Sequence, residues 1–269
     1  MKFLETGAIV YREEIHPGLF LIRYHSPQIA KIGEPGQFVH IRVGSGVDPL
    51  LRRPFSIQNI IGPEIEILLK VYGRGSDLLS ALQVGDTLDT LGPLGNPWRI
   101  PDDVSSVVGV SGGVGVAPVL FQQERWKKAI PFYHLIGART GGELPLTERQ
   151  IHHSHINIAT DNGSRGFHGT VVRLAEQQMN EGVFGDNPYF LTCGPWAMMK
   201  ALIAWTELYG YRGQFSAEAR MGCAVGVCQG CAVARPLENG TARQYYLCCK
   251  DGPVFDFGTI DMEVSPFGA

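Results

Sequence analysis

The stretch SVVGVSGGVGVAP, residues 106–118, carries the chain from a short apolar run into a helical segment through a turn rich in glycine. Residues 106–110 predict a buried strand, and residues 117–129 predict the helix that follows. Glycines let a backbone turn sharply, and free N–H groups at the start of a helix attract a pyrophosphate. Pro118 occupies the last position of the G-x-G-x-x-G fingerprint, so the turn departs from that motif. A nucleotide site and a plain tight turn both remain open on this stretch alone.

Downstream of this turn, strand and helix patterns alternate. Alternation of this kind favours a parallel sheet with crossover helices, and we assign residues 102–214 to one α/β domain. The predicted strands are residues 132–137, 155–160 and 188–192, and the predicted helices are residues 170–178 and 196–209.

Upstream, the first hundred residues show short strand patterns separated by Gly, Pro or Asp. Six strands at this spacing indicate an antiparallel β-barrel over residues 1–101, with a short helix at 76–82. The predicted strands are residues 7–11, 19–25, 37–43, 54–59, 65–72 and 87–91.

Three short motifs in these two regions could bind a ligand. Residues 52–56, RRPFS, offer cations, a ring and a hydroxyl at the start of a strand, and residues 73–76, GRGS, open a helix in the manner of a phosphate cradle. A surface arginine pair beside a core phenylalanine is the alternative for the first motif. Residues 193–195, CGP, end a strand where ligands bind in open α/β sheets. A buried structural cysteine is the alternative there.

The C-terminal segment, residues 215–269, holds five of the six cysteines and shows no periodic helix or long strand. Cys223, Cys228 and Cys231 have the C-x4-C-x2-C spacing of a plant-type [2Fe–2S] centre, whose four ligands are thiolates. Zinc and inert buried thiols are the alternatives, although zinc sites usually pair C-x2-C with another such pair or with histidines. The adjacent Cys248 and Cys249 both remain candidates for the fourth ligand. We expect a small cluster domain that depends on its metal for stability.

Composition narrows the class of protein. The 269-residue chain has 44% hydrophobic and 18% charged residues, 34 glycines and 17 prolines, which suits strands and tight loops. A formal net charge of −3 argues against a nucleic-acid surface. We find no apolar run that fits a signal peptide or a membrane span, and therefore expect a cytoplasmic protein without membrane attachment. In a reducing compartment, clustered cysteines are more often metal ligands than disulfides.

Taken in order, these motifs resemble the ferredoxin–NADP reductase superfamily. RPFS at 53–56 and GRGS at 73–76 resemble its two flavin motifs, GGVGVAP at 112–118 its pyridine-nucleotide motif, and CGP at 193–195 the motif near the nicotinamide. Within that superfamily, EARMGCAVGVCQGC at 218–231 and CKDGPVF at 249–255 resemble the electron-transfer subunit of the heteromeric, NAD-linked dihydroorotate dehydrogenase. The position of the second segment favours Cys249 as the fourth ligand. Ala224 in place of the usual glycine, the long segment after Cys231 and the extra Cys248 depart from the family pattern.

The resemblance implies three cofactors, FAD, a [2Fe–2S] cluster and NAD, and a role for each motif residue. Ser56 and Cys193 would be the catalytic residues, beside the reactive end of the flavin and the nicotinamide. The cluster ligands would be Cys223, Cys228, Cys231 and Cys249. The other cofactor-binding residues implied are Arg53, Pro54, Phe55, Lys70, Tyr72, Gly75 and Ser76 for FAD, and Gly113, Gly115 and Gly194 for NAD.

The same resemblance implies a partner and a route for the electrons. A hydride would pass between NAD(H) and the flavin, and the cluster would link the flavin to the FMN of a dihydroorotate dehydrogenase catalytic subunit, in a heterotetramer that serves pyrimidine biosynthesis. Asp161, after the strand at 155–160, would repel the 2′-phosphate of NADP, whereas Arg139 and Arg165 would attract it.

Three other functions compete with this interpretation. The first is the small subunit of an NAD(P)H–ferredoxin oxidoreductase or sulfide dehydrogenase, in which aspartate typically replaces the first cysteine. Cys223 argues against that alternative. The second is the reductase component of an oxygenase, in which the fourth cysteine often lies much further from the third. The third is a zinc-stabilised binding module without redox activity, and the presence of both Arg53 and Ser56 counts against it.

Overall fold

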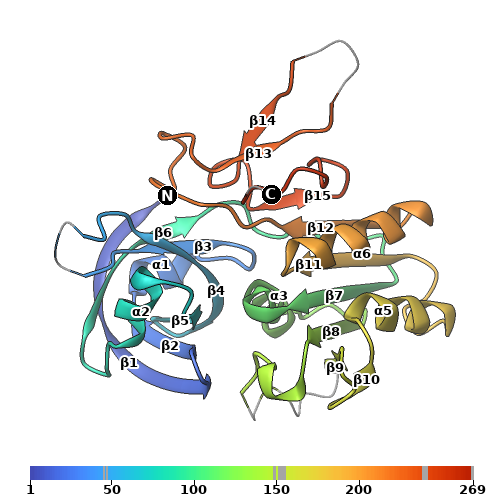
Figure 1. The fold of residues 1–269 in the computed structure, drawn as a ribbon, viewed down its shortest axis with the longest axis horizontal. Coiled ribbons are helices and arrows are strands. Elements are labelled where there is room, and N and C mark those ends of the chain that lie inside the picture. The colour runs from blue at the N-terminus through green and yellow to red at the C-terminus, as the bar shows by residue number, and fades with distance from the viewer. Residues whose placement is uncertain (45, 47, 148–149, 151–155, 238–241, 268–269) are drawn as a thin grey trace.

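The computed structural model describes residues 1–44, 46, 48–147, 150, 156–237 and 242–267. Figure 1 shows a β-barrel and a twisted sheet with helices side by side, and a C-terminal segment that runs over both. The expected combination of an antiparallel barrel, a parallel-sheet α/β domain and a C-terminal segment is confirmed. Among the described residues, no helix combines the length and the apolar character needed to cross a bilayer.

Six antiparallel strands close the barrel in the order β1-β2-β5-β4-β3-β6. Apolar side chains such as Ile22, Val39 and Ile57 alternate inward along these strands and form one core. Besides the expected helix α2 (Arg74–Ser80), the barrel carries a helix that we did not predict, α1 (Pro27–Ile32). The strands are β1 (Phe3–His16), β2 (Leu19–His25), β3 (Phe38–Ile41), β4 (Arg53–Ile61), β5 (Glu64–Lys70) and β6 (Thr87–Leu94).

The second sheet has seven strands in the order β10-β9-β8-β7-β11-β12-β15, all parallel except β15. The chain first adds strands on one side of β7 and then on the other, so the strand order reverses between β7 and β11. The strands are β7 (Ser106–Gly112), β8 (Phe132–Ala138), β9 (Ile156–Thr160), β10 (Phe167–His168), β11 (Pro188–Cys193), β12 (Arg212–Ser216) and β15 (Val254–Asp256). The predicted strand at 155–160 begins at His155, which lies outside the described residues.

Helices connect these parallel strands. They are α3 (Val116–Arg125), α5 (Val171–Asn180) and α6 (Trp196–Leu208), with the short 3-10 turns η1 (Gly113–Gly115) and η2 (Gly141–Glu143). The helix α3 also packs against the barrel, where Val116 and Leu120 share a core with Leu21 and Leu68. This apolar contact fixes the glycine turn at the start of α3 beside the barrel wall.

The C-terminal segment contributes a two-stranded antiparallel ribbon and one strand of the large sheet. The ribbon consists of β13 (Ala232–Ala234) and β14 (Tyr245–Leu247). The third strand, β15, pairs antiparallel with β12, and Phe255 lies opposite Phe215. The segment also shares a core with the barrel through Phe38 and Leu94 and with α6 through Ile203.

Candidate functional site

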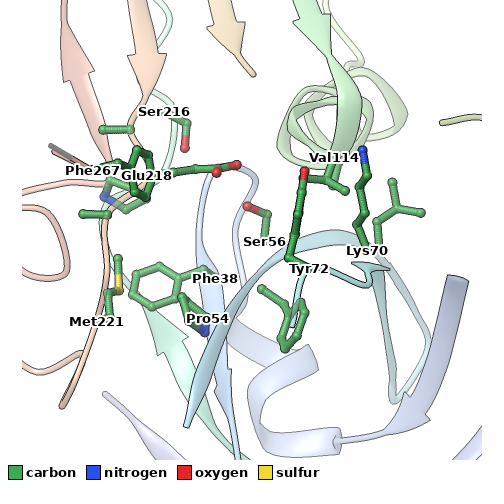
Figure 2. A pocket seen from close by; sticks show the side chains of 16 residues that line it. Phe38, Pro54, Ser56, Lys70, Tyr72, Val114, Ser216, Glu218, Met221 and Phe267 are labelled. Atoms are coloured by element: carbon green, nitrogen blue, oxygen red, sulfur yellow. The ribbon is translucent and has the colours of Figure 1, made fainter. Parts of the chain in front are cut away.

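A cavity lies where the barrel, the helix α3 and the chain after β12 meet (Figure 2). It brings together five residues that the sequence singled out: Pro54, Phe55, Ser56, Lys70 and Tyr72. The opposite wall consists of Val114 and Ala117 from the glycine turn and α3, and of residues 216–219 and 221 after β12. The cavity is therefore bounded by parts of the barrel, the α/β sheet and the C-terminal segment, which are far apart in the sequence.

Strand pairing explains the position of Ser56. In the β3–β4 ladder Ser56 lies opposite Phe38, so both side chains leave the sheet on the cavity side. Tyr72 follows β5 and keeps 76% of its surface exposed, with the Lys70 ammonium 5.2 Å from the centre of its ring. An exposed aromatic ring beside an apolar cavity suits a flat heterocycle such as an isoalloxazine.

A second hollow, continuous with this wall, is lined by Arg53, Gly73, Gly75 and Ser76. A Cβ on Gly75 would lie 2.8 Å from Nε of Arg53, so this position leaves room only for glycine while the guanidinium stays there. The Ser76 hydroxyl oxygen accepts hydrogen bonds from N–H of Tyr72 at 2.8 Å and of Gly73 at 3.1 Å, which fixes the turn. A guanidinium beside a glycine turn at the start of a helix suits a diphosphate.

The neighbouring Arg52 does not share this role. Its guanidinium turns toward β6, where it donates to the carboxylate of Asp89 at 2.9 Å. Of the arginine pair, only Arg53 lines this hollow, together with the cations Lys70 and Arg74.

Glu218 is a site residue that the sequence analysis did not assign. Its carboxylate and the Ser56 hydroxyl point into the same space in Figure 2. The Glu218 side chain is exposed toward the cavity, and protein surrounds it on the other sides. The surrounding protein disfavours the charged carboxylate and so raises the pKa of the carboxyl group. Glu218 follows β12 by two residues, at the sheet edge where ligands bind in α/β folds, and that position could have revealed it. Phe267 also lines the cavity and was not predicted.

Cys193 lies at the end of β11, opposite Ser111 of β7. Only 1% of its surface is exposed, and burial raises the pKa of its thiol far above the usual range, so the sulfur is neutral. A Cβ on Gly115 would lie 2.4 Å from the carbonyl of Cys193 and 2.5 Å from N of Gly194. The glycine turn and the loop after β11 therefore touch backbone to backbone, while Gly113 has open space around it and a φ of +54°.

The cysteine loop holds its sulfurs with backbone N–H groups. The Cys223 sulfur accepts from N–H of Val225 at 3.5 Å and of Val227 and Cys228 at 3.3 Å each. Burial acts to raise the pKa of this thiol, but the N–H groups outweigh it and lower the pKa to about 6. N–H groups aimed at a sulfur stabilise a thiolate, as the ligands of an iron–sulfur cluster require.

The adjacent Cys248 and Cys249 have different hydrogen-bond partners in the structure. The N–H of Cys249 donates to the Cys231 sulfur at 3.5 Å, so residue 249 lies beside the cysteine loop. The Cys248 thiol instead donates to the carbonyl of Ala217 at 3.3 Å and is fully buried. Ala224 has a φ of +58°, in the left-handed region that favours glycine. That conformation explains why a glycine would be usual at this position.

Comparisons with known proteins agree with this geometry. A family model described as the iron-sulfur cluster binding domain of dihydroorotate dehydrogenase B matches residues 218–261. A solved structure of an NADH-dependent reduced ferredoxin-NADP oxidoreductase aligns with a TM-score of 0.80 at 29% identity, covering 96% of this chain and 90% of that one. A ferredoxin NADP+ reductase from Neisseria gonorrhoeae aligns with a TM-score of 0.64 at 19% identity, covering 81% and 94%, and shows the same fold.

The fold and the site define a flavin-dependent reductase of the ferredoxin–NADP reductase type that carries an iron–sulfur domain. Two curated relatives make the assignment more specific, and both are named dihydroorotate dehydrogenase B (NAD(+)), electron transfer subunit. The protein from Desulforamulus reducens is 35% identical over 247 residues, covering 90% of this chain and 92% of that one. The protein from Bacillus cereus strain G9842 is 33% identical over 258 residues, covering 94% and 96%. The chain belongs to this family of electron transfer subunits.

Proposed function

We propose that this chain exchanges electrons between NAD(H) and the FMN of a dihydroorotate dehydrogenase catalytic subunit, through FAD and a [2Fe–2S] cluster of its own. When bound, FAD would supply both hydride and single-electron chemistry, and a [2Fe–2S] cluster would supply single-electron transfer. The observation that carries the proposal is that one cavity adjoins both a nucleotide-type turn and the strand that leads to the cysteine loop. The turn forms one wall of the cavity, and the end of that strand forms another.

The barrel region, residues 1–101, would hold FAD. Ser56 would donate to the reactive edge of the flavin, with Pro54, Phe55 and the backbone at Lys70 along its side and Tyr72 against its face. Arg53, Gly75 and Ser76 would receive the pyrophosphate. The chemistry of these donors fits the cofactor, since an apolar slot adjoins a cationic cradle.

Residues 102–214 would hold NAD. Gly113 and Gly115 would receive its pyrophosphate, and the loop of Cys193 and Gly194 would hold the nicotinamide near the cavity. A neutral, buried Cys193 would shape this site by contact, since a thiol with so high a pKa takes no part as a base. Glu218 has the raised pKa and the position to hold a proton beside Ser56.

Residues 215–269 would bind the cluster through Cys223, Cys228, Cys231 and Cys249. The N–H bonds to the sulfurs of Cys223 and Cys231 support this set, and the inward hydrogen bond of Cys248 argues against its inclusion. We further propose a heterotetramer with the catalytic subunit, located in the cytoplasm, in which the substrate site belongs to the partner.

Anaerobic co-expression with a dihydroorotate dehydrogenase catalytic subunit tests the proposal. We expect the complex to contain FAD, FMN, and iron and acid-labile sulfide in equal amounts. Dihydroorotate should reduce NAD+ only when both chains are present. A purified chain that holds zinc without sulfide or flavin would refute the proposal.

A further inference from the structure

The topology fixes which way a dinucleotide would run across the sheet. In open α/β sheets a dinucleotide crosses the carboxyl ends of the strands where the strand order reverses, here between β7 and β11. Ser216 at the end of β12, the strand beside β11, lines the flavin-type cavity, so the nicotinamide half belongs on that side of the reversal. The adenosine half then lies over the carboxyl ends of β8 and β9.

Two loops at those ends are joined to each other by hydrogen bonds. The N–H of Asp161 donates to the carbonyl of Ala138 at 3.1 Å, and the N–H of Asn162 donates to the carbonyl of Arg139 at 3.2 Å. The N–H of Gly141 donates to the Ser164 hydroxyl at 2.8 Å. The backbone at the adenosine end is therefore held as one unit, and the charges on it have fixed neighbours.

Four charged side chains extend from this unit: Arg139, Glu143, Asp161 and Arg165. Arg139 forms an ion pair. Nε of Arg139 donates to the carboxylate of Glu143, in η2, at 2.9 Å, and both groups remain accessible, with 77% and 40% of their side chains exposed. The carboxylate of Asp161 lies near the same guanidinium. Arg165 is exposed in the second loop. A 2′-phosphate approaching Arg139 would thus meet two carboxylates, and Arg165, whose Cβ would lie 3.2 Å from a Cβ on Gly141, is the second cation of the unit.

We propose that Glu143, together with Asp161, selects NAD over NADP by neutralising Arg139 and presenting negative charge to the 2′ position of the adenosine ribose. A 2′-hydroxyl can donate to a carboxylate, whereas a 2′-phosphate is repelled by it. Glu143 is here a specificity-determining residue. The inference rests on the proposed function, because it assumes that this sheet binds a pyridine nucleotide.

The test compares four forms of the anaerobic holoenzyme complex: wild type, Glu143→Gln, Glu143→Gln with Arg139→Ala, and Asp102→Asn. Asp102 pairs with Lys128 at 2.5 Å on the surface, at the opposite end of the sheet, so its variant removes an equivalent charge far from the site. Calorimetric titration with NAD+ and with NADP+ gives the ratio of the two dissociation constants. Hydride transfer from NADH and NADPH is measured in parallel by stopped flow.

In Glu143→Gln we expect the preference for NAD+ over NADP+ to fall about tenfold at low salt, with the effect shrinking as salt is added. Removing Arg139 as well should restore the wild-type ratio, and Asp102→Asn should leave the ratio unchanged. A ratio in Glu143→Gln within about twofold of wild type overturns the inference. So does a wild type that binds NADP+ as tightly as NAD+. A wild type that binds neither nucleotide refutes the proposed function itself.

Discussion

Replacing Gly115 by alanine should damage the contact between the glycine turn and the loop after β11. Gly115 has a φ of −63°, which alanine adopts without strain, so only the added methyl group matters. That Cβ would lie 2.4 Å from the carbonyl of Cys193, and ordinary contact begins at 3.4 Å, so the two backbones must separate by 3.4 − 2.4 = 1.0 Å. Because β7 and β11 are paired strands, neither backbone can yield easily.

Overpacking of a rigid interior costs about 1–3 kcal/mol, and a clash of backbone with methyl belongs at the upper end. A loss of about 3 kcal/mol lowers the melting temperature by roughly 6–12 °C in a protein of this size. We also expect weaker NAD binding, because the turn proposed to receive the pyrophosphate would be displaced. Scanning calorimetry of the anaerobic holoprotein and a nucleotide titration measure the two effects.

Gly113→Ala in the same turn is the matched control. Its φ of +54° strains an alanine, but a Cβ there has open space around it. We expect a loss of only about 1 kcal/mol, or roughly 2–4 °C. If Gly115→Ala melts with the wild type, or Gly113→Ala proves the more harmful, the proposed backbone contact is wrong.

Three further outcomes follow from the site and the barrel. Cys249→Ser should lose iron and acid-labile sulfide. Cys248→Ser should keep both, because the native Cys248 thiol donates to the carbonyl of Ala217 instead. Equal loss in both variants would contradict the ligand assignment. Arg53→Ala should weaken FAD binding about 10–100-fold by equilibrium titration, because one charge-assisted contact is lost, while Arg52→Ala should bind FAD normally. Burial lowers the pKa of His40 from 6.5 to about 4 in the folded protein. As the pH falls, the unfolded chain therefore binds this proton before the folded protein does. The free energy of unfolding should fall between about pH 6.5 and about pH 4. His40→Gln should remove this dependence in urea titrations, and the control His16→Asn should not.

The sequence predicts the fold well wherever a pattern repeats over several residues. The strand at residues 19–25 has the predicted bounds, because apolar residues dominate it and turns flank it. Three residues of the RPFS motif line one cavity with Lys70 and Tyr72, which come just before the GRGS motif. In these cases the signal is local, and tertiary contacts only complete it.

Features that depend on distant neighbours were not predictable. The helix α1 has only six residues, too few for a helical period. The strand β15 has three residues and exists through its pairing with β12, nearly forty residues earlier. Glu218 carries no motif of its own, and only the folded sheet places its carboxylate opposite Ser56.

Because β15 pairs with β12, the supply of iron should affect the solubility of this chain. β12 ends seven residues before Cys223, and β15 starts five residues after Cys249, so iron held by these two proposed ligands would close a loop whose two ends lie at the sheet margin. Without iron that loop would lose one of its constraints, and a loosened β15 would leave β12 with unpaired N–H and C=O groups open to other chains. Cells starved of iron should therefore accumulate this chain as aggregates rather than as a soluble apoprotein.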